Sequence, residues 1–350
     1  MAAPLRIGVI GAGANTREKH LPGLLAQPDV RIVGVANRSR ESGERVAREF
    51  GIPRVATDWR EIVAATDLDA VCIGTWPYLH AEITIAALRA GKHVLTEARM
   101  ARDHAEARAM LSEARKHPHL VTQIVPAPFS LPFDATVRAW LDAGKLGRVL
   151  DVQAVCTHGK LADGAAPFGW RQDFVLSGKN TLFLGIYYEM VRRWLHRDPE
   201  SVVAEAAIHH RERRDESGIL REVKIPDRVT VLGRYADGAR LLLHVSGVES
   251  SAPRNEIRVH GTAGALRADF AANRLFFASA GGTEQEVAIE PALRGEWRVE
   301  ADFVASIREG APVRLTDFAS GERYMAFTDA VWESWSNDGV RVALAPAPTA

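Results

Sequence analysis

The chain has 350 residues, of which 47% are apolar and 25% charged, and this length is sufficient for two domains with separate hydrophobic cores. Its 44 Lys and Arg residues balance 44 Asp and Glu residues, which excludes the strongly basic surface expected of a protein that binds nucleic acid or an anionic membrane. Only Cys72 and Cys156 occur, both within apolar runs, and no apolar run approaches the length of a membrane span. Because the first predicted strand begins at Leu5 and leaves no room for a signal peptide, we expect a cytoplasmic protein.

The first predicted element is a strand over residues 5–10, followed by a glycine turn and a segment that is compatible with a helix. In such a unit Gly11 turns the chain, and Gly13 leaves room for a pyrophosphate at the positive end of the helix. Thr16 stands where the dinucleotide fingerprint usually has its third glycine, so the motif is incomplete. An ordinary glycine turn between a strand and a helix is the alternative.

A second apolar strand, predicted over residues 30–35, ends just before Asn37. This is about where an Asp or Glu binds the adenosine ribose 2′-hydroxyl of NAD. A neutral amide removes the repulsion against a 2′-phosphate, and Arg38 and Ser39 offer a guanidinium and a hydroxyl to that group. The pattern therefore favours NADP, with NAD possible, unless Arg38 and Arg40 only begin a solvated helix.

The rest of the first half alternates helices and strands. Helices are predicted over residues 41–50, 81–90 and 103–116, the last opened by a capping box of Asp103 and Glu106, and strands over residues 70–73, 92–96 and 120–125. This rhythm is typical of crossover units in a parallel sheet, whose ligands bind at the carboxyl ends of the strands.

Several motifs in order along the chain resemble the Gfo/Idh/MocA family, the relatives of glucose-fructose oxidoreductase and inositol dehydrogenase. In the first half these are Gly-x-Gly followed by His20-Leu21-Pro22, then Thr75-x-Pro77-x-x-His80, then Ala90-Gly91-Lys92-His93-Val94-Leu95-x-Glu97. In the second half they are Trp170-Arg171-Gln172-Asp173, Ser177-Gly178, Gly185, Val259-His260-Gly261-Thr262-Ala263-Gly264 and Glu300-x-x-Phe303. The resemblance covers essentially the whole chain.

The resemblance implies an α/β fold with an N-terminal Rossmann dinucleotide-binding domain, residues 1–125, and a C-terminal α+β domain with a large open, mainly antiparallel sheet, residues 126–342. Residues 343–350, rich in Ala and Pro, are expected to form a flexible tail. Because family members commonly pair such sheets face to face, a homodimer or homotetramer is expected. The sequence pattern of the second half predicts strands over residues 149–155, 202–208, 229–235, 240–248, 256–260, 266–270 and 275–278, and helices over residues 132–144, 181–194, 297–308 and 318–336.

Family members generally use a Lys in a Glu-Lys-Pro motif and an Asp-x-x-x-His pair on a helix of the second domain to move the substrate proton. Here Glu97 is kept, but Ala98 and Arg99 replace the Lys and Pro, and Phe183 and Tyr187 stand where the Asp and His are expected. A guanidinium stays charged and cannot shuttle a proton. Tyr187 is a competent acid, but its ordinary pKa of about 10 would have to fall for base catalysis.

We therefore predict Tyr187 as a proton relay, with Arg99 or Lys179 lowering its pKa and with Asp173 as the carboxylate able to replace the missing base. The alternative is that Tyr187 is only a core aromatic. The predicted cofactor-binding residues are Gly11, Gly13, Ala14, Asn15, Asn37, Arg38, Ser39, Thr75, Trp76, Pro77, His80, Glu97 and Arg171. The predicted substrate contacts are Gln123, His158, Trp170, Lys179 and Tyr188. Cys156 and His158 alternate on one strand face, but no further ligand has metal-site spacing, so we predict no metal.

The resulting prediction is an NADP-preferring oxidoreductase that moves a hydride to or from a sugar, a cyclitol or a related polyhydroxy or oxo compound. Two alternatives stay open. One is a lyase or glycoside hydrolase that retains its nicotinamide and oxidises the substrate only transiently. The other is a regulator that keeps the cofactor site after losing the catalytic residues.

Overall fold

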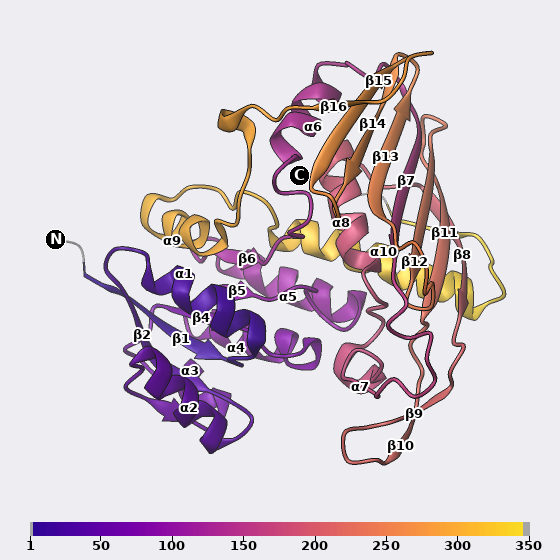
Figure 1. The fold of residues 1–350 in the computed structure, drawn as a ribbon. Helices are drawn as coiled ribbons and strands as arrows, with labels where there is room; N and C mark the ends of the chain where they lie inside the picture. The colour runs from indigo at the N-terminus through magenta and orange to yellow at the C-terminus, as the bar shows by residue number, and fades with distance from the viewer. Residues whose placement is uncertain (1–2, 346–350) are drawn as a thin grey trace. The chain divides into compact units, whose positions relative to one another are not determined.

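The computed structural model describes residues 3–345 and divides into two compact units (Figure 1). The first unit contains the chain up to Pro126 together with Arg298–Glu322. The second contains Ala127–Trp297 and the chain from Arg323 onward. The chain therefore leaves the first unit, builds most of the second, and returns to the first before it ends in the second.

The first unit is built on a six-stranded parallel sheet in the order β3-β2-β1-β4-β5-β6. Its strands are β1 (Leu5–Ile10), β2 (Val30–Ala36), β3 (Val55–Ala56), β4 (Ala70–Ile73), β5 (His93–Thr96) and β6 (Thr122–Ile124). Every pairing is parallel, and β1 and β4 are almost entirely buried, as expected of strands covered on both faces. The predicted Rossmann fold is confirmed.

Helices cover this sheet. They are α1 (Leu21–Leu25), α2 (Arg40–Phe50), α3 (Trp59–Ala64), α4 (His80–Arg89), α5 (His104–Lys116) and α9 (Val299–Glu309). Helices α3, α4 and α5 pack side by side, whereas α1 packs against β2 and α9. Asp103 caps α5 by accepting a hydrogen bond from Glu106 N at 2.9 Å, but the Glu106 carboxylate accepts from Arg102 N rather than from Asp103 N. Only half of the predicted capping box therefore forms.

The second unit is built on a nine-stranded sheet in the order β16-β15-β14-β13-β7-β12-β11-β8-β17. Its strands are β7 (Val149–Thr157), β8 (Ser201–Ala207), β11 (Arg228–Arg234), β12 (Arg240–Ser246), β13 (Asn255–Gly261), β14 (Gly264–Asp269), β15 (Arg274–Ser279), β16 (Gln285–Val287) and β17 (Val342–Ala343). All pairings are antiparallel except that of β7 with β12. The predicted large, mainly antiparallel sheet is confirmed.

Helices pack on one face of this sheet (Figure 1). They are α6 (Asp134–Asp142), α8 (Leu184–Leu195) and the part of α10 (Phe318–Ser336) that follows Arg323. Tyr188 of α8 stacks on Phe327 of α10 at 3.6 Å between ring centroids, and Ser334 Oγ of α10 accepts a hydrogen bond from Ala204 N of β8 at 2.8 Å. These contacts hold both helices against the sheet.

Residues 211–216, Arg-Glu-Arg-Arg-Asp-Glu, form a cluster of mixed charge. Part of it lies in a short hairpin of β9 (Glu212–Arg214) and β10 (Leu220–Glu222). Arg213 is 2% exposed, and its guanidinium donates hydrogen bonds to the carbonyl oxygens of Leu161, Asp163 and Ala166. Arg213 therefore has a structural role, because its buried guanidinium holds the loop at residues 161–166 against the hairpin.

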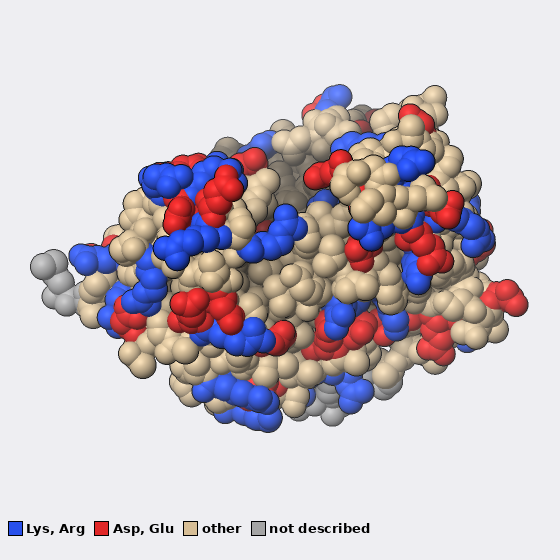
Figure 2. Space-filling view, turned by 90° about the horizontal axis from the view of Figure 1, so that it is seen from below, with Lys and Arg blue, Asp and Glu red and all other residues tan. Residues whose placement is uncertain are grey.

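At the C-terminal end, Leu344 is buried and its N–H donates to Glu200 O at 2.9 Å. Residues 346–350 of the predicted tail lie outside the described part of the chain. No helix of the described residues is both long enough and apolar enough to cross a membrane. On the face shown in Figure 2, Lys and Arg side chains are interspersed with Asp and Glu side chains.

Candidate functional site

The glycine turn after β1 has the geometry that its residues predict. Gly11 has a φ of +86°, and a Cβ built there would lie 2.6 Å from Thr75 N, so a larger residue would collide with the end of β4. A Cβ built at Gly13 meets no atom within 4 Å. The turn is therefore tight at Gly11 and open at Gly13, as a backbone that approaches a phosphate requires.

Thr16 stands at the position of the third glycine of the fingerprint, and the helix still approaches the sheet closely. It is buried in the π-helical turn Thr16–His20, and its Oγ1 donates to Gly11 O at 3.0 Å. A Cβ at Gly74 would lie 2.0 Å from Thr16 Oγ1 and 2.3 Å from Gly11 O. The close approach of helix and sheet therefore depends on Gly74, a glycine that sequence reasoning did not assign to this role.

Asn37, at the end of β2, is tied to the glycine turn. Its Oδ1 accepts a hydrogen bond from Ala12 N at 2.7 Å, which leaves the side-chain NH2 to donate elsewhere. The Arg38 guanidinium lies 5.5 Å from the ring centroid of Trp76, whereas Arg40 is paired with Glu44. Ser39 Oγ caps α2 by accepting from Ser42 N, so its hydroxyl proton stays available as a donor.

His80 joins two turns at the carboxyl edge of the sheet. Its ring nitrogens lie 2.9 Å from Thr75 O and 3.0 Å from Arg99 O, and burial lowers the pKa of its imidazole. His80 thereby holds the turn at Pro77 and the segment after Glu97 together. Within that segment, the peptide bond between Ala98 and Arg99 is cis. His80 and Arg99 are both buried in the first unit.

Glu97, at the end of β5, belongs to a cluster that sequence reasoning only partly found. His20 is fully buried between two carboxylates, with Nε2 2.9 Å from Glu97 Oε1 and Nδ1 2.6 Å from Glu300 Oε1. Asn15 Nδ2 also donates to Glu97 Oε1. Burial alone lowers the pKa of His20, but the hydrogen bonds and charges of Glu300 and Glu97 prevail and raise it to about 9. His20 is therefore an imidazolium at neutral pH.

In the second unit, Tyr187 is buried in an aromatic cluster. Its side chain is 1% exposed and lies near the rings of Phe129 and Phe270. Burial raises the pKa of Tyr187 far above its ordinary value, and the charge interaction and then the hydrogen bond with Cys156 raise it further. This shift is opposite to the one that base catalysis by Tyr187 needs. Burial likewise raises the pKa of Cys156, to about 11.

The segment that contains the predicted substrate contacts Trp170 and Lys179 is held by hydrogen bonds within the segment and by an ion pair to α10. Asp173 caps α7 (Phe174–Ser177) by accepting from Val175 N and Leu176 N, and Lys179 Nζ pairs with Asp329 Oδ2 at 2.7 Å. The Arg171 guanidinium lies over the ring of Trp170 at 4.2 Å.

His158 follows β7 and is half-buried, and burial lowers its pKa. Its ring contacts Phe183 edge-on at 6.4 Å, so it borders the aromatic cluster that contains Tyr187. Among the residues that the structure describes, no group of three or more His, Cys, Asp or Glu side chains is arranged to hold a metal ion.

Two other predicted substrate residues are buried and have partners within their own units. Gln123 Nε2 donates to Val299 O at 2.9 Å, which fixes β6 to the start of α9. The Tyr188 hydroxyl donates to Asp198 Oδ1 at 2.5 Å, beside its stacking contact with α10.

The carboxyl ends of β1, β2, β4 and β5 thus meet in the first unit, as the contacts of Ala12 with Asn37, of Gly11 with Thr75 and of Asn15 with Glu97 show. An open glycine turn, the Asn37 amide group, whose NH2 has no partner among residues 3–345, and a cation at Arg38 fit the phosphates and ribose of a dinucleotide. The sequence analysis did not predict the contacts of His20 with Glu97 and Glu300, although all three residues lie within motifs that carried the family resemblance.

Known proteins match both units. Residues 5–124 match the family described as "Oxidoreductase family, NAD-binding Rossmann fold", and residues 135–267 match the GFO/IDH/MocA C-terminal domain. Levoglucosan dehydrogenase of Pseudarthrobacter phenanthrenivorans is 27% identical over 94% of this chain and 96% of its own. Trans-1,2-dihydrobenzene-1,2-diol dehydrogenase of Sus scrofa is 28% identical over 74% of this chain and 72% of its own.

The fold is also found among solved structures. A levoglucosan dehydrogenase structure in complex with NADH and levoglucosan superposes with a TM-score of 0.87 at 25% identity, covering 99% of this chain and 100% of that one. The apo form of levoglucosan dehydrogenase gives a TM-score of 0.89, also at 25% identity and with the same coverage.

Proposed function

Because the chain belongs to the Gfo/Idh/MocA family of oxidoreductases with an NAD-binding Rossmann fold, we propose that it oxidises or reduces a sugar, a cyclitol or a related polyhydroxy or oxo compound. The observation that carries this proposal is the glycine turn, which is tight at Gly11, open at Gly13 and bordered by Asn37, Thr75 and Glu97. The named activities of the relatives, which act on levoglucosan and on a dihydrodiol, support this class of substrate.

Different residues of the first unit would hold different parts of the dinucleotide. The turn from Gly11 to Asn15 would hold the pyrophosphate, Asn37 and its neighbours the adenosine ribose, and Thr75 to Pro77 together with Glu97 the nicotinamide end. The nicotinamide supplies a carbon that accepts or donates the hydride. The protein must then take up or supply the proton of the substrate hydroxyl.

NADP is the cofactor that the side chains after β2 favour. Asn37 places no negative charge beside the ribose, and the Arg38 guanidinium has no ion pair among the described residues. A 2′-phosphate would gain a charge-assisted contact from Arg38. Arg38→Ala should therefore weaken NADPH binding about tenfold and leave NADH binding nearly unchanged.

Fluorescence titration of the two reduced cofactors tests this preference. Arg40→Ala is the matched control, because Arg40 is the adjacent arginine and is already paired with Glu44. If Arg38→Ala weakened the affinity for NADPH and for NADH by the same factor, Arg38 would not bind the 2′-phosphate.

We also propose that Tyr187 is the proton relay and that it acts as the proton donor when a carbonyl is reduced. A phenol with a raised pKa keeps its proton, so it suits a donor to a developing alkoxide better than an acceptor from an alcohol. In the reductive step the hydride goes to the carbonyl carbon and the Tyr187 proton to its oxygen, and solvent restores the proton afterwards.

The test follows absorbance of the reduced nicotinamide with a panel of sugars, inositols, uronates and their keto forms. Substrate-dependent turnover that disappears in Tyr187→Phe supports the relay. Tyr235→Phe is the matched control, because Tyr235 is a buried tyrosine of the same unit whose hydroxyl has no hydrogen-bond partner among the described residues. Tight cofactor binding without turnover of any compound would instead favour the transient-oxidation lyase or the regulator.

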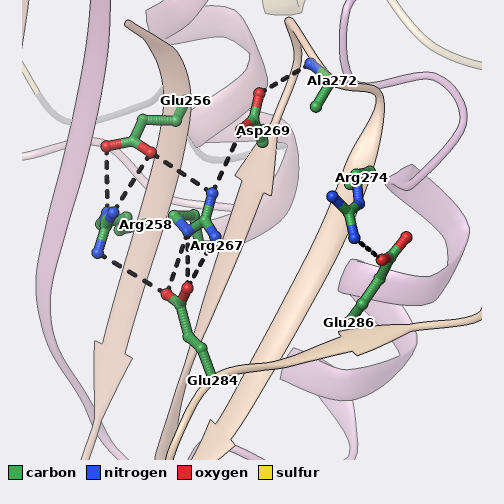
Figure 3. Close-up of polar contacts among 8 residues, drawn as sticks. All are labelled: Glu256, Arg258, Arg267, Asp269, Ala272, Arg274, Glu284 and Glu286. Atoms are coloured by element: carbon green, nitrogen blue, oxygen red, sulfur yellow. Dashed lines mark hydrogen bonds and ion pairs between the residues drawn. The ribbon is translucent and has the colours of Figure 1, made fainter.

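The open face of the nine-stranded sheet supports the proposal of a homodimer or homotetramer. One row of paired residues crosses this face from β8 to β16, and it consists of Val203, Leu232, Leu242, Gln153, Arg258, Arg267, Phe276 and Glu286. At its charged end, on β13 to β16, Arg267 contacts Glu284 and Asp269, while Arg258 contacts Glu256 (Figure 3). At its apolar end Leu232 is 56% exposed.

A second copy of the chain would cover the apolar end of this row. Leu232→Arg should therefore convert the oligomer to monomer in sedimentation velocity. Leu220→Arg is the control, because Leu220 is 49% exposed on the β9–β10 hairpin, outside the nine-stranded sheet. A wild-type monomer would refute the assembly without affecting the cofactor site.

A further inference from the structure

A buried charge cluster connects α9, which the chain adds after completing most of the second unit, to the cofactor edge of the first. Its centre is His20, whose two ring nitrogens face Glu97 Oε1 at 2.9 Å and Glu300 Oε1 at 2.6 Å. His20 is fully buried, and Glu300 is nearly so. Such a cation can persist in the interior only because it has carboxylates on both sides.

The cluster extends from Glu300 to the glycine turn. Glu97 Oε1 accepts from His20 and from Asn15 Nδ2, and Glu97 Oε2 accepts from Ala98 N at 3.2 Å. Asn15 lies in the turn predicted to hold the pyrophosphate, and Glu97 ends β5. One carboxylate therefore joins the two segments on which the cofactor would rest, and its own orientation depends on the His20 cation.

Two further titratable groups lie near this cluster, and burial disfavours the charged form of each. Cys72 of β4 is buried, with a thiol pKa raised first by burial and then by Glu97 and Glu300. His80 of α4 is buried, with a pKa lowered by desolvation. Among the described contacts, the charges of the cluster are those of His20, Glu97 and Glu300.

Gly23 of α1 makes room for Glu300. A Cβ at this position would lie 2.6 Å from Glu300 Oε2 and 2.8 Å from Glu300 Cδ. The carboxylate is thus seated between α1 and α9, and it can be displaced without removing its charge.

We propose that Glu300 and His20 are positioning residues for the cofactor, which hold Glu97 and through it Asn15 in the arrangement that receives the dinucleotide. The inference rests on the proposed function, because it concerns the same cofactor site. Neither residue needs to touch the cofactor. Their effect is transmitted through the Glu97 carboxylate.

Glu300→Gln tests this directly, since it keeps the size of the side chain and removes the charge that holds the His20 proton. We expect the Kd of NADPH and of NADH, measured by fluorescence titration of the purified protein, to rise about tenfold. Glu309→Gln is the matched control, because Glu309 ends the same helix and is exposed, and it should leave both Kd values unchanged. Gly23→Ala should raise both Kd values as Glu300→Gln does, because its Cβ would displace the Glu300 carboxylate.

Two further measurements separate positioning from a structural role. In a Glu97→Gln background, Glu300→Gln should change the Kd by less than about twofold, because the residue through which it acts has already been altered. In addition, wild-type affinity should decline as the pH rises through about 9, and this decline should shift to lower pH in Glu300→Gln.

The outcomes are distinguishable. Wild-type protein that binds neither nucleotide refutes the proposed function. Wild-type protein that binds, with unchanged affinity in Glu300→Gln and only a lower melting temperature, overturns the inference and leaves Glu300 as a structural tether of α9. The inference would also be overturned if the changes in binding free energy caused by Glu97→Gln and Glu300→Gln were additive in the double variant.

Discussion

Raising the pH should destabilise the first unit through His20, by an amount that follows from its surroundings. The pKa of His20 is about 9 in the folded protein and about 6.5 in an unfolded chain, so the folded state binds the extra proton between these values. Stability from this group is therefore fully present below about pH 6.5 and is lost as the pH rises through about 9. From about pH 7 to pH 10 the loss amounts to about 2–3 kcal/mol, or about 1 kcal/mol per pH unit.

The assay is urea unfolding over this pH range, with the His20 ring titrated in parallel by nitrogen NMR. Glu300→Gln is the comparison, because it removes one of the two carboxylates that stabilise the imidazolium and should flatten the slope. The buried cysteines also favour the folded state less as the pH rises. Glu300→Gln leaves the contribution of Cys156 unchanged, and the pKa of Cys72 is raised first by burial and only in smaller part by the Glu300 charge. Identical slopes in the two proteins, or a His20 midpoint near its ordinary value, would refute this reasoning.

Three other substitutions have outcomes that follow from the packing. Gly11→Ala should abolish nucleotide binding in fluorescence titration while the circular dichroism spectrum is retained, because its Cβ would lie 2.6 Å from Thr75 N at a φ of +86°. Arg193→Met should lower the free energy of unfolding by about 3–5 kcal/mol in urea, since it removes a buried guanidinium that pairs with the carboxylates of both Asp134 and Glu189. Phe327→Ala should cost about 3–5 kcal/mol in the same assay, because the ring is buried and stacks on Tyr188.

Local patterning explains why much of the fold could be predicted. The continuous apolar run of β4, Ala70–Ile73, and the length and pattern of α10, Phe318–Ser336, are properties of neighbouring residues, and both elements have the predicted bounds. The return of Arg298–Glu322 to the first unit is not a local property, because an amphipathic helix does not specify which apolar surface will cover it.

The candidate site divides in the same way. Gly11, Gly13 and Asn37 are recognisable because a turn and the end of a strand are encoded by adjacent residues. The pairing of His20 with Glu300 spans 280 positions, and the compensation of Thr16 by Gly74 depends on the distance between a helix and a strand. Neither relation is visible in the order of the residues.

By itself, the sequence determined the alternation of elements, the glycine turn after β1 and the family, because these depend on residue types at short and regular spacings. Only the tertiary structure decided the ionisation of the titratable groups. Burial beside Cys156 raises the pKa of Tyr187, and two carboxylates hold a proton on a fully buried His20. A pKa depends on the solvent and charges around a group, and these surroundings are assembled only when distant segments pack together.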